Sequence, residues 1–283
     1  MILVTGATGN IGSEVVKQLV AKGKKVRVVS RDAAKLSNIP ASVEKVVGEI
    51  SDASTLQKAV DGADEIFLFP LLHEEDHKSM KAILKEAKKA GTSKVVMLSS
   101  LGARAGTQNA IGKLHREKEE LVEASGIDWT LVRPGSFMTN TFQWLPTIRS
   151  LGTVFNPTGE GKVAPISPRD IAAVSVAALT ENHVGKIFEL TGPELLSAPE
   201  QAEILAKATG LAIRCVDVPA EQAAEQAQKS GLPDFIATAL GQMWSRIKSG
   251  QLAVVTHDVQ QVTGNTGETF KEWCERNRAA FLN

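Results

Sequence analysis

The sequence Met1-Ile2-Leu3-Val4-Thr5-Gly6-Ala7-Thr8-Gly9-Asn10-Ile11-Gly12 opens the chain and decides its fold. Its apolar start, residues 1–4, predicts a short buried strand. Apolar side chains then recur at helical spacing over residues 11–20, and Gly23 stands where a helix would end. The order is therefore strand, glycine turn, helix.

The three glycines of this turn suit three different tasks. Gly6 lets the chain turn sharply out of the strand, Gly9 lets backbone approach a bulky anion, and Gly12 lets the helix pack closely on the sheet. The free N–H groups of the first helical turn then face a pyrophosphate. The alternative is a tight turn that binds nothing, but this context favours a dinucleotide site. We expect the pyrophosphate to be held by Gly6, Thr8, Gly9, Asn10, Ile11 and Gly12.

The glycine spacing, Gly-x-x-Gly-x-x-Gly after Thr5, resembles that of the short-chain dehydrogenase/reductase superfamily. More narrowly, residues 5–12 are similar to the atypical NmrA-like members and to the related quinone, triphenylmethane-dye and isoflavone-type reductases. The resemblance implies an α/β fold with a doubly wound parallel sheet, the Rossmann fold. We expect a dinucleotide-binding core over residues 1–133. A smaller substrate-covering portion would span 134–283, with 167–192 packing back on the core.

Composition limits the classes of function. The chain has 283 residues, and its 32 basic and 32 acidic side chains balance, which gives no indication of nucleic acid or a membrane surface as partner. No apolar run approaches the ~20 residues of a membrane helix, and no basic region precedes the first strand as in a signal peptide. We expect a cytoplasmic monomer or homodimer that acts on a small molecule.

Two groups of residues could suggest metal binding. Cys215 and Cys274 have no metal-binding spacing and indicate no disulfide framework. The acidic and histidine side chains of residues 73–77 are neighbours in sequence, and such neighbours rarely converge on one ion. They complement the N-terminal end of the next helix instead, so we expect no metal.

The end of the second strand, predicted over Lys25 to Ser30, bears on the choice of cofactor. An NAD-specific fold usually places a carboxylate near here to hold the ribose 2′-hydroxyl, but Arg31 stands there instead. A guanidinium suits the 2′-phosphate of NADP, and Lys35 could add charge. The alternative is that Arg31 pairs with Asp32 at the surface. We expect NADP(H), with NAD(H) as the other possibility.

Further strands are predicted over residues 43–47, 64–70, 94–99 and 128–133, and their ends face the ligand crevice. The resemblance implies that Glu49 and Ile50 border the adenine. The alternative there is a strand end followed by a helix cap. We expect the nicotinamide side to be lined by Phe69, Pro70 and Leu71, with Ser99 also at the cofactor. Ser100 matches by position a serine that typical short-chain enzymes use on the substrate carbonyl.

The chain has no tyrosine, so it lacks the Tyr-x-x-x-Lys pair that serves typical members as proton donor. His115 and Glu119 lie four residues apart on one face of a predicted helix, at the same separation. The resemblance places His115 where isoflavone-type reductases carry a catalytic lysine. Histidine can donate a proton near neutrality, and Glu119 would raise its pKa. The alternative is a half-buried helix histidine, and some related reductases are thought to need no protein acid.

The segment after Arg133-Pro134-Gly135 gathers apolar and amide side chains at a strand end. A stacking pocket for a flat substrate needs such groups, and ordinary core filling is the alternative. The candidate substrate residues are Phe137, Met138, Asn140 and Trp144. Further on, an apolar stripe over 235–247 favours a core or dimer contact over a substrate wall, and a closing helix is predicted over 270–281.

Two functions follow from these expectations. The first is an NAD(P)H-dependent oxidoreductase, with NADPH favoured. It would transfer hydride to a small conjugated or aromatic acceptor such as a quinone, dye, ketone or imine. The second is a regulatory protein like NmrA itself, which binds the dinucleotide without turning it over and acts through a protein partner. The missing Tyr-x-x-x-Lys pair suits both, while the aromatic segment at 137–144 favours the enzyme.

Overall fold

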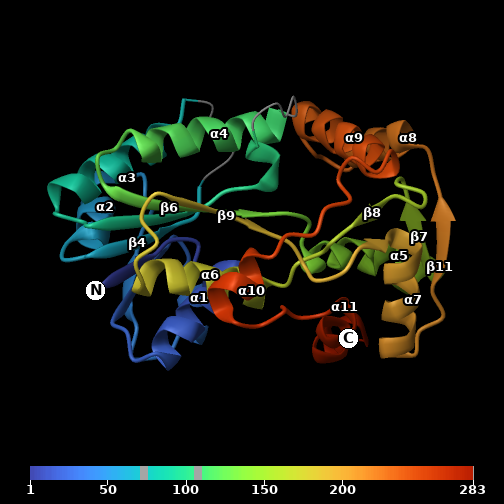
Figure 1. Ribbon diagram of the computed structural model, residues 1–283, viewed down its shortest axis with the longest axis horizontal. Coiled ribbons are helices and arrows are strands. Elements are labelled where there is room, and N and C mark those ends of the chain that lie inside the picture. Colours follow the sequence, from blue (N-terminus) through green and yellow to red (C-terminus); the bar gives the residue numbers. More distant parts are fainter. Residues whose placement is uncertain (71–75, 105–109, 283) are drawn as a thin grey trace.

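The computed structural model describes residues 1–70, 76–104 and 110–282. Among these residues, seven parallel strands form the main sheet in the order β3-β2-β1-β4-β5-β6-β9 (Figure 1). The order runs outward in both directions from β1, which is the doubly wound arrangement. The predicted Rossmann fold is therefore confirmed. Its strands are β1 (Ile2–Val4), β2 (Val26–Ser30), β3 (Glu44–Val47), β4 (Glu65–Leu68), β5 (Lys94–Leu98), β6 (Asp128–Pro134) and β9 (Lys186–Leu190).

Helices cover both faces of this sheet, as Figure 1 shows. Its central strands are apolar on both sides for that reason: Val95, Val96 and Met97 of β5 are all fully buried. The helices form two layers with separate apolar cores. One layer holds α1 (Asn10–Ala21) and α6 (Pro168–Thr180), and the other holds α2 (Ala53–Val60), α3 (Lys78–Lys89) and α4 (Ala110–Glu123).

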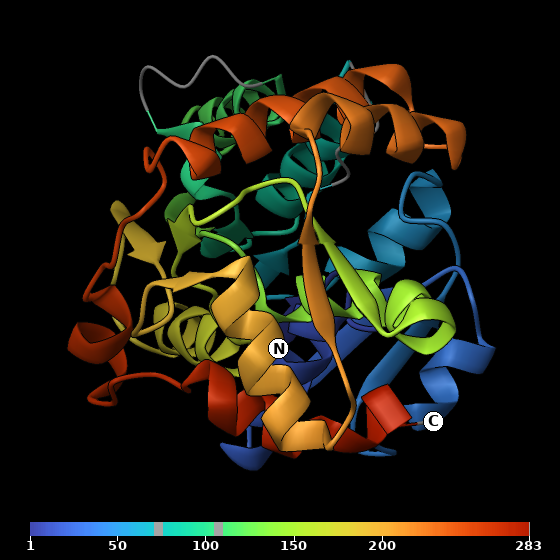
Figure 2. The same ribbon diagram turned by 90° about the vertical axis from the view of Figure 1, so that its right-hand side faces the viewer.

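A third apolar core lies beyond the carboxyl ends of the strands, around the buried rings of Phe270 and Trp273. Figure 2 looks onto this side of the molecule, with α7 and β11 in front. Two small sheets belong to it, one pairing β7 with β11 and one pairing β8 with β10. The elements are η3 (Met138–Trp144), α5 (Leu145–Leu151), β7 (Thr153–Asn156), β8 (Lys162–Val163), β10 (Leu196–Ser197), α7 (Ala198–Thr209) and β11 (Arg214–Asp217).

The chain between these parts returns to the main sheet. Ser167 caps α6 by accepting a hydrogen bond from the Asp170 amide, and Pro168 occupies the first helical turn. Strand β9 then pairs with β6 at the edge of the sheet. Helix α10 (Asp258–Thr263) follows much later and packs against α6 and β9.

The last helices differ in part from the prediction. The closing helix expected over 270–281 is two helices, α11 (Phe270–Arg276) and α12 (Arg278–Leu282). The break falls at Asn277, whose backbone and side-chain amides both donate to the Trp273 carbonyl, at 3.0 and 2.8 Å. The apolar stripe over 235–247 lies on α9 (Asp234–Lys248), which packs against α8 (Ala220–Lys229). Phe235 on this stripe is 46% exposed.

Two features are absent from the described residues. None of the described helices combines the length and the apolar character needed to cross a bilayer. Across the same part of the chain, no group of three or more histidine, cysteine, aspartate or glutamate side chains could hold a metal ion. Residues 73–75 of the acidic group lie outside the described residues.

Candidate functional site

The glycine turn connects β1 to α1 at the centre of the sheet. The Thr5 hydroxyl accepts a hydrogen bond from the Phe69 amide at 2.7 Å, and the Thr5 amide donates to the Phe67 carbonyl at 3.0 Å. The turn is thus fixed to the end of β4. Helix α1 starts at Asn10 with Gly9 as its N-cap, and no described side chain caps that end. Its first N–H groups therefore suit a bound anion, as a pyrophosphate requires.

The geometry separates the roles of the three glycines. Gly6 has a φ of +64°, and a Cβ there would lie 2.9 Å from Phe69 Cβ. A Cβ on Gly12 would lie 2.2 Å from the Gly6 carbonyl oxygen, so the helix can pack here only without a side chain. Gly9 has no such restriction, because its nearest neighbour would be 3.4 Å away. Gly6 and Gly12 hold the turn together, and Gly9 is left open toward a ligand.

A cleft of about 260 Å³ opens beside this turn, at the carboxyl ends of β1 to β4. Its lining brings together predicted cofactor residues from four separate segments, namely Gly6, Thr8, Arg31, Lys35, Glu49, Ile50, Phe69 and Pro70. Gly9, Asn10, Ile11 and Gly12 begin α1 next to it, with Ile11 and Gly12 buried beneath the turn. Leu71 lies outside the described residues. The cleft is where a dinucleotide fits this fold.

After β2, Arg31 does not form the surface pair with Asp32 that was the alternative to a cofactor role. Arg31 Nε lies 3.8 Å from Glu49 Oε2, so its acidic partner is Glu49 and not Asp32. Asp32 Oδ1 accepts the Ala34 amide at 2.9 Å and helps to begin η1 (Ala34–Asn38). The Arg31 side chain is 77% exposed and remains open to a further anion.

Ser99, the first residue after β5, belongs to a buried polar network centred on Glu119. The Ser99 hydroxyl donates to Glu119 Oε1, and Arg133 donates to both carboxylate oxygens at 2.8 and 2.6 Å. Arg116 adds a bond at 2.9 Å. Burial alone would raise the pKa of Glu119, but hydrogen bonds from Arg133, Ser99 and Arg116 outweigh burial and hold the pKa below its usual value.

His115 lies one helical turn before Glu119 but forms no hydrogen bond with it. Its side chain is buried, and its Nδ1 has no hydrogen-bond partner among the described residues. Burial lowers the pKa of His115 to about 4; Glu119 opposes this shift and Lys118 adds to it. Glu119 thus acts on this pKa in the expected direction, but burial outweighs it and the net shift is downward. At neutral pH the ring is uncharged and can donate one N–H hydrogen bond.

The sequence reasoning passed over Lys118, whose side chain is fully buried. Lys118 Nζ lies 2.7 Å from His77 Nδ1, and His77 Nε2 lies 3.1 Å from a Glu117 oxygen. A signal was present: Lys118 follows His115 by three and precedes Val122 by four, which places it on the buried face of α4.

The predicted substrate residues have unequal exposure. Met138 is fully buried in the third core, which favours core filling for this side chain. Trp144 packs against the same core and Phe137 against the first, both partly exposed, while Asn140 is exposed. Ser100 Oγ accepts the Gly102 amide and begins η2 (Leu101–Ala103), so part of its hydrogen-bonding capacity is used locally.

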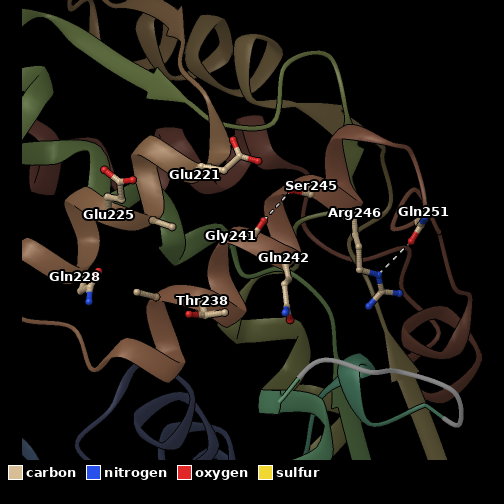
Figure 3. A pocket seen from close by; sticks show the side chains of 11 residues that line it. Glu221, Glu225, Gln228, Thr238, Gly241, Gln242, Ser245, Arg246 and Gln251 are labelled. Atoms are coloured by element: carbon tan, nitrogen blue, oxygen red, sulfur yellow. Dashed lines mark hydrogen bonds between the residues drawn. The ribbon is translucent and has the colours of Figure 1, made fainter.

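A larger cavity of about 890 Å³ lies elsewhere, in the groove between α8 and α9. Figure 3 shows its lining, with Glu221 and Glu225 on α8, and with Arg246 donating to the Gln251 side chain. Every lining residue falls within residues 221–251, and none comes from the sheet or the glycine turn. The larger cavity is therefore separate from the cofactor cleft.

Comparison with known proteins agrees with this geometry. Residues 6–182 match the family described as NAD(P)H-binding. The chain is 37% identical to an NAD(P)H azoreductase of Xenophilus azovorans over 99% of both proteins. It has the fold of an NADPH-dependent quinone oxidoreductase of Escherichia coli solved with NADPH (TM-score 0.85, 24% identity, 100% of both chains). It also has the fold of a Citrobacter triphenylmethane reductase solved with NADP(H) (TM-score 0.82, 22% identity, 98% and 100%).

The doubly wound sheet and its glycine turn thus define a dinucleotide-binding Rossmann protein. The chain belongs to the NAD(P)H-binding family.

Proposed function

We propose that this protein is an NADPH-preferring oxidoreductase that reduces small conjugated or aromatic acceptors, such as quinones and azo dyes. One observation carries the proposal: α1 begins without a side-chain cap beside a cleft that holds both Arg31 and Phe69. The amides suit a pyrophosphate, Arg31 suits a 2′-phosphate, and Phe69 offers an apolar surface to the nicotinamide end. The bound cofactor supplies the hydride.

The names of relatives support the class of acceptor. One relative is called an azoreductase, and another, 25% identical over 96% of both proteins, is called a quinone oxidoreductase. Both names denote flat, conjugated acceptors. Phe69 is 42% exposed and lines the cleft, so part of its ring surface is open for stacking against such a molecule.

The uncharged state of the His115 ring supports the same class of acceptor, a conjugated molecule such as a quinone. A quinone that accepts hydride becomes a delocalised hydroquinone anion, which can take its proton from water. Such an acceptor needs no protein acid, and the neutral His115 ring could still donate a hydrogen bond to the acceptor oxygen. An acceptor whose reduction demands a strong acid fits this site less well.

The test is turnover. Purified protein and NADPH are mixed with a panel of quinones, azo and triphenylmethane dyes, activated ketones and imines, and loss of reduced nicotinamide absorbance is followed. We expect oxidation in proportion to protein with quinones or dyes, and little with simple ketones. Tight binding of oxidised cofactor without turnover of any acceptor would contradict the enzyme and favour the NmrA-like sensor.

A further inference from the structure

Arg31 and Glu49 face each other on the side of the cleft formed by the ends of two neighbouring strands, β2 and β3. Strands β2 and β3 are parallel and pair Ser30 with Val47, and the Gly48 amide continues the ladder to the Ser30 carbonyl at 3.0 Å. The next residues, Arg31 and Glu49, therefore leave the sheet side by side. Their side chains lie 3.8 Å apart, and both line the cleft.

The backbone keeps Glu49 in this place. Gly48 has a φ of +153°, and a Cβ there would lie 2.3 Å from the Thr55 hydroxyl oxygen. The chain before Glu49 is thus packed directly on α2, which fixes the backbone position from which the Glu49 side chain extends. The Glu49 side chain itself is 40% exposed, so changes at its tip leave the packing intact.

Two other charged side chains, Asp32 and Lys35, lie near this pair. Asp32 uses Oδ1 on the Ala34 amide, and Ser30 Oγ accepts the Asp32 amide at 3.2 Å, so Asp32 is held in its own turn. Lys35 also lines the cleft. Glu49 is therefore the carboxylate that competes for the Arg31 guanidinium.

We propose that Glu49 is a specificity-determining residue that opposes Arg31, so that the cleft accepts both NADPH and NADH. The inference rests on the proposed function. A 2′-phosphate must take Arg31 from Glu49 and then lie close to a second negative charge, which costs free energy. A 2′-hydroxyl can instead donate a hydrogen bond to Glu49. Arg31 thus favours NADPH, and Glu49 favours NADH.

The experiment measures dissociation constants of NADPH and NADH by calorimetry for the wild type, Glu49→Gln and Arg31→Ala. Glu49→Gln should raise the preference for NADPH over NADH about tenfold, equal to about 1.4 kcal/mol. Arg31→Ala should lower it by at least as much, while NADH still binds through Glu49. The matched control is Glu86→Gln, which removes the same charge on α3, where Glu86 pairs with Lys89. The control should leave the preference unchanged.

The outcomes distinguish a failure of the role proposed for Glu49 from a failure of the proposed function. An unchanged preference in Glu49→Gln would overturn the role of Glu49, and so would an equal change in Glu86→Gln, which would point to overall charge. If the wild type bound neither nucleotide, the proposed function itself would fail. Thermal melting of each variant shows whether it is folded, so a lost preference can be told apart from a lost structure.

Discussion

At the scale of single residues, the glycine turn makes a prediction that separates folding from binding. Gly12→Ala places a methyl group 2.2 Å from the Gly6 carbonyl oxygen and should lower the free energy of unfolding by roughly 3 kcal/mol or more. Gly9→Ala meets no such contact and should cost only about 1 kcal/mol, the loss of a good N-cap residue. Urea denaturation measures both.

The Gly9→Ala variant should also differ from the wild type in its affinity for NADPH. Gly9→Ala should weaken NADPH binding at least about tenfold, because its methyl group stands where the pyrophosphate approaches the backbone. Calorimetry on folded protein measures this effect. Unchanged affinity in Gly9→Ala would show that the anion does not lie on this turn.

His115 makes a second residue-scale prediction, about pH. With a pKa of about 4, the ring is neutral over the whole working range, and its contribution as a hydrogen-bond donor should not vary there. The ratio of wild-type to His115→Ala rates should therefore exceed one and stay constant between about pH 5 and about pH 8. Steady-state rates with a quinone measure it, with His115→Gln as the variant that keeps a donor. A ratio that falls with a midpoint near the usual histidine pKa would contradict this state of the ring.

At the scale of elements, Glu119 connects α4 to the ends of β5 and β6. Glu119→Gln removes the charge that pairs most closely with Arg133 and leaves this buried guanidinium with Glu189 at 3.8 Å as its acidic partner. We expect a loss of about 3–5 kcal/mol in the free energy of unfolding at neutral pH. Glu120→Gln is the control, because Glu120 is 60% exposed and pairs only at the surface with Arg116, so it should cost within about 0.5 kcal/mol.

The decrease in the free energy of unfolding caused by Glu119→Gln should depend on pH in one direction. The pKa of Glu119 is lower in the folded protein, so its contribution is present above the unfolded pKa and disappears as the pH falls through the folded one. The gap between wild type and Glu119→Gln, from urea denaturation, should therefore shrink in acid. A gap that stayed constant or grew would mean that the Glu119 charge is not what stabilises the network.

Elements with local signals could be predicted from the sequence. The first strand, the glycine turn and α1 follow from periodicity and spacing within residues 1–23, and these are properties of neighbouring residues. The break at Asn277 could not be foreseen in this way, because apolar spacing continues across it. At the break, the Asn277 side chain shares the Trp273 carbonyl with its own backbone amide, which is a contact that apolar spacing does not reveal.

At the scale of the whole molecule, the sequence predicts which strand ends lie together but not which individual side chains are in contact. The cleft residues from β1 to β4 could be predicted together, because strand ends of a parallel sheet share one edge. Individual side-chain pairs could not, since the Glu49 partner of Arg31 follows β3, and the Arg133 partner of Glu119 lies on β6 while Glu119 itself lies on α4. The contact of Lys118 could not be foreseen either, although its spacing on α4 indicates a buried position: His77 lies 41 positions earlier in the chain.

The most direct measurement of the central claim is a calorimetric titration of the purified wild-type chain with NADPH. Amides at the start of α1 and the cleft beside them predict a saturable heat corresponding to one nucleotide per chain. That heat should be reduced in Gly9→Ala protein that still melts cooperatively. Absence of any binding heat for NADPH, NADP⁺, NADH and NAD⁺ with folded protein, at more than one temperature, would contradict the account.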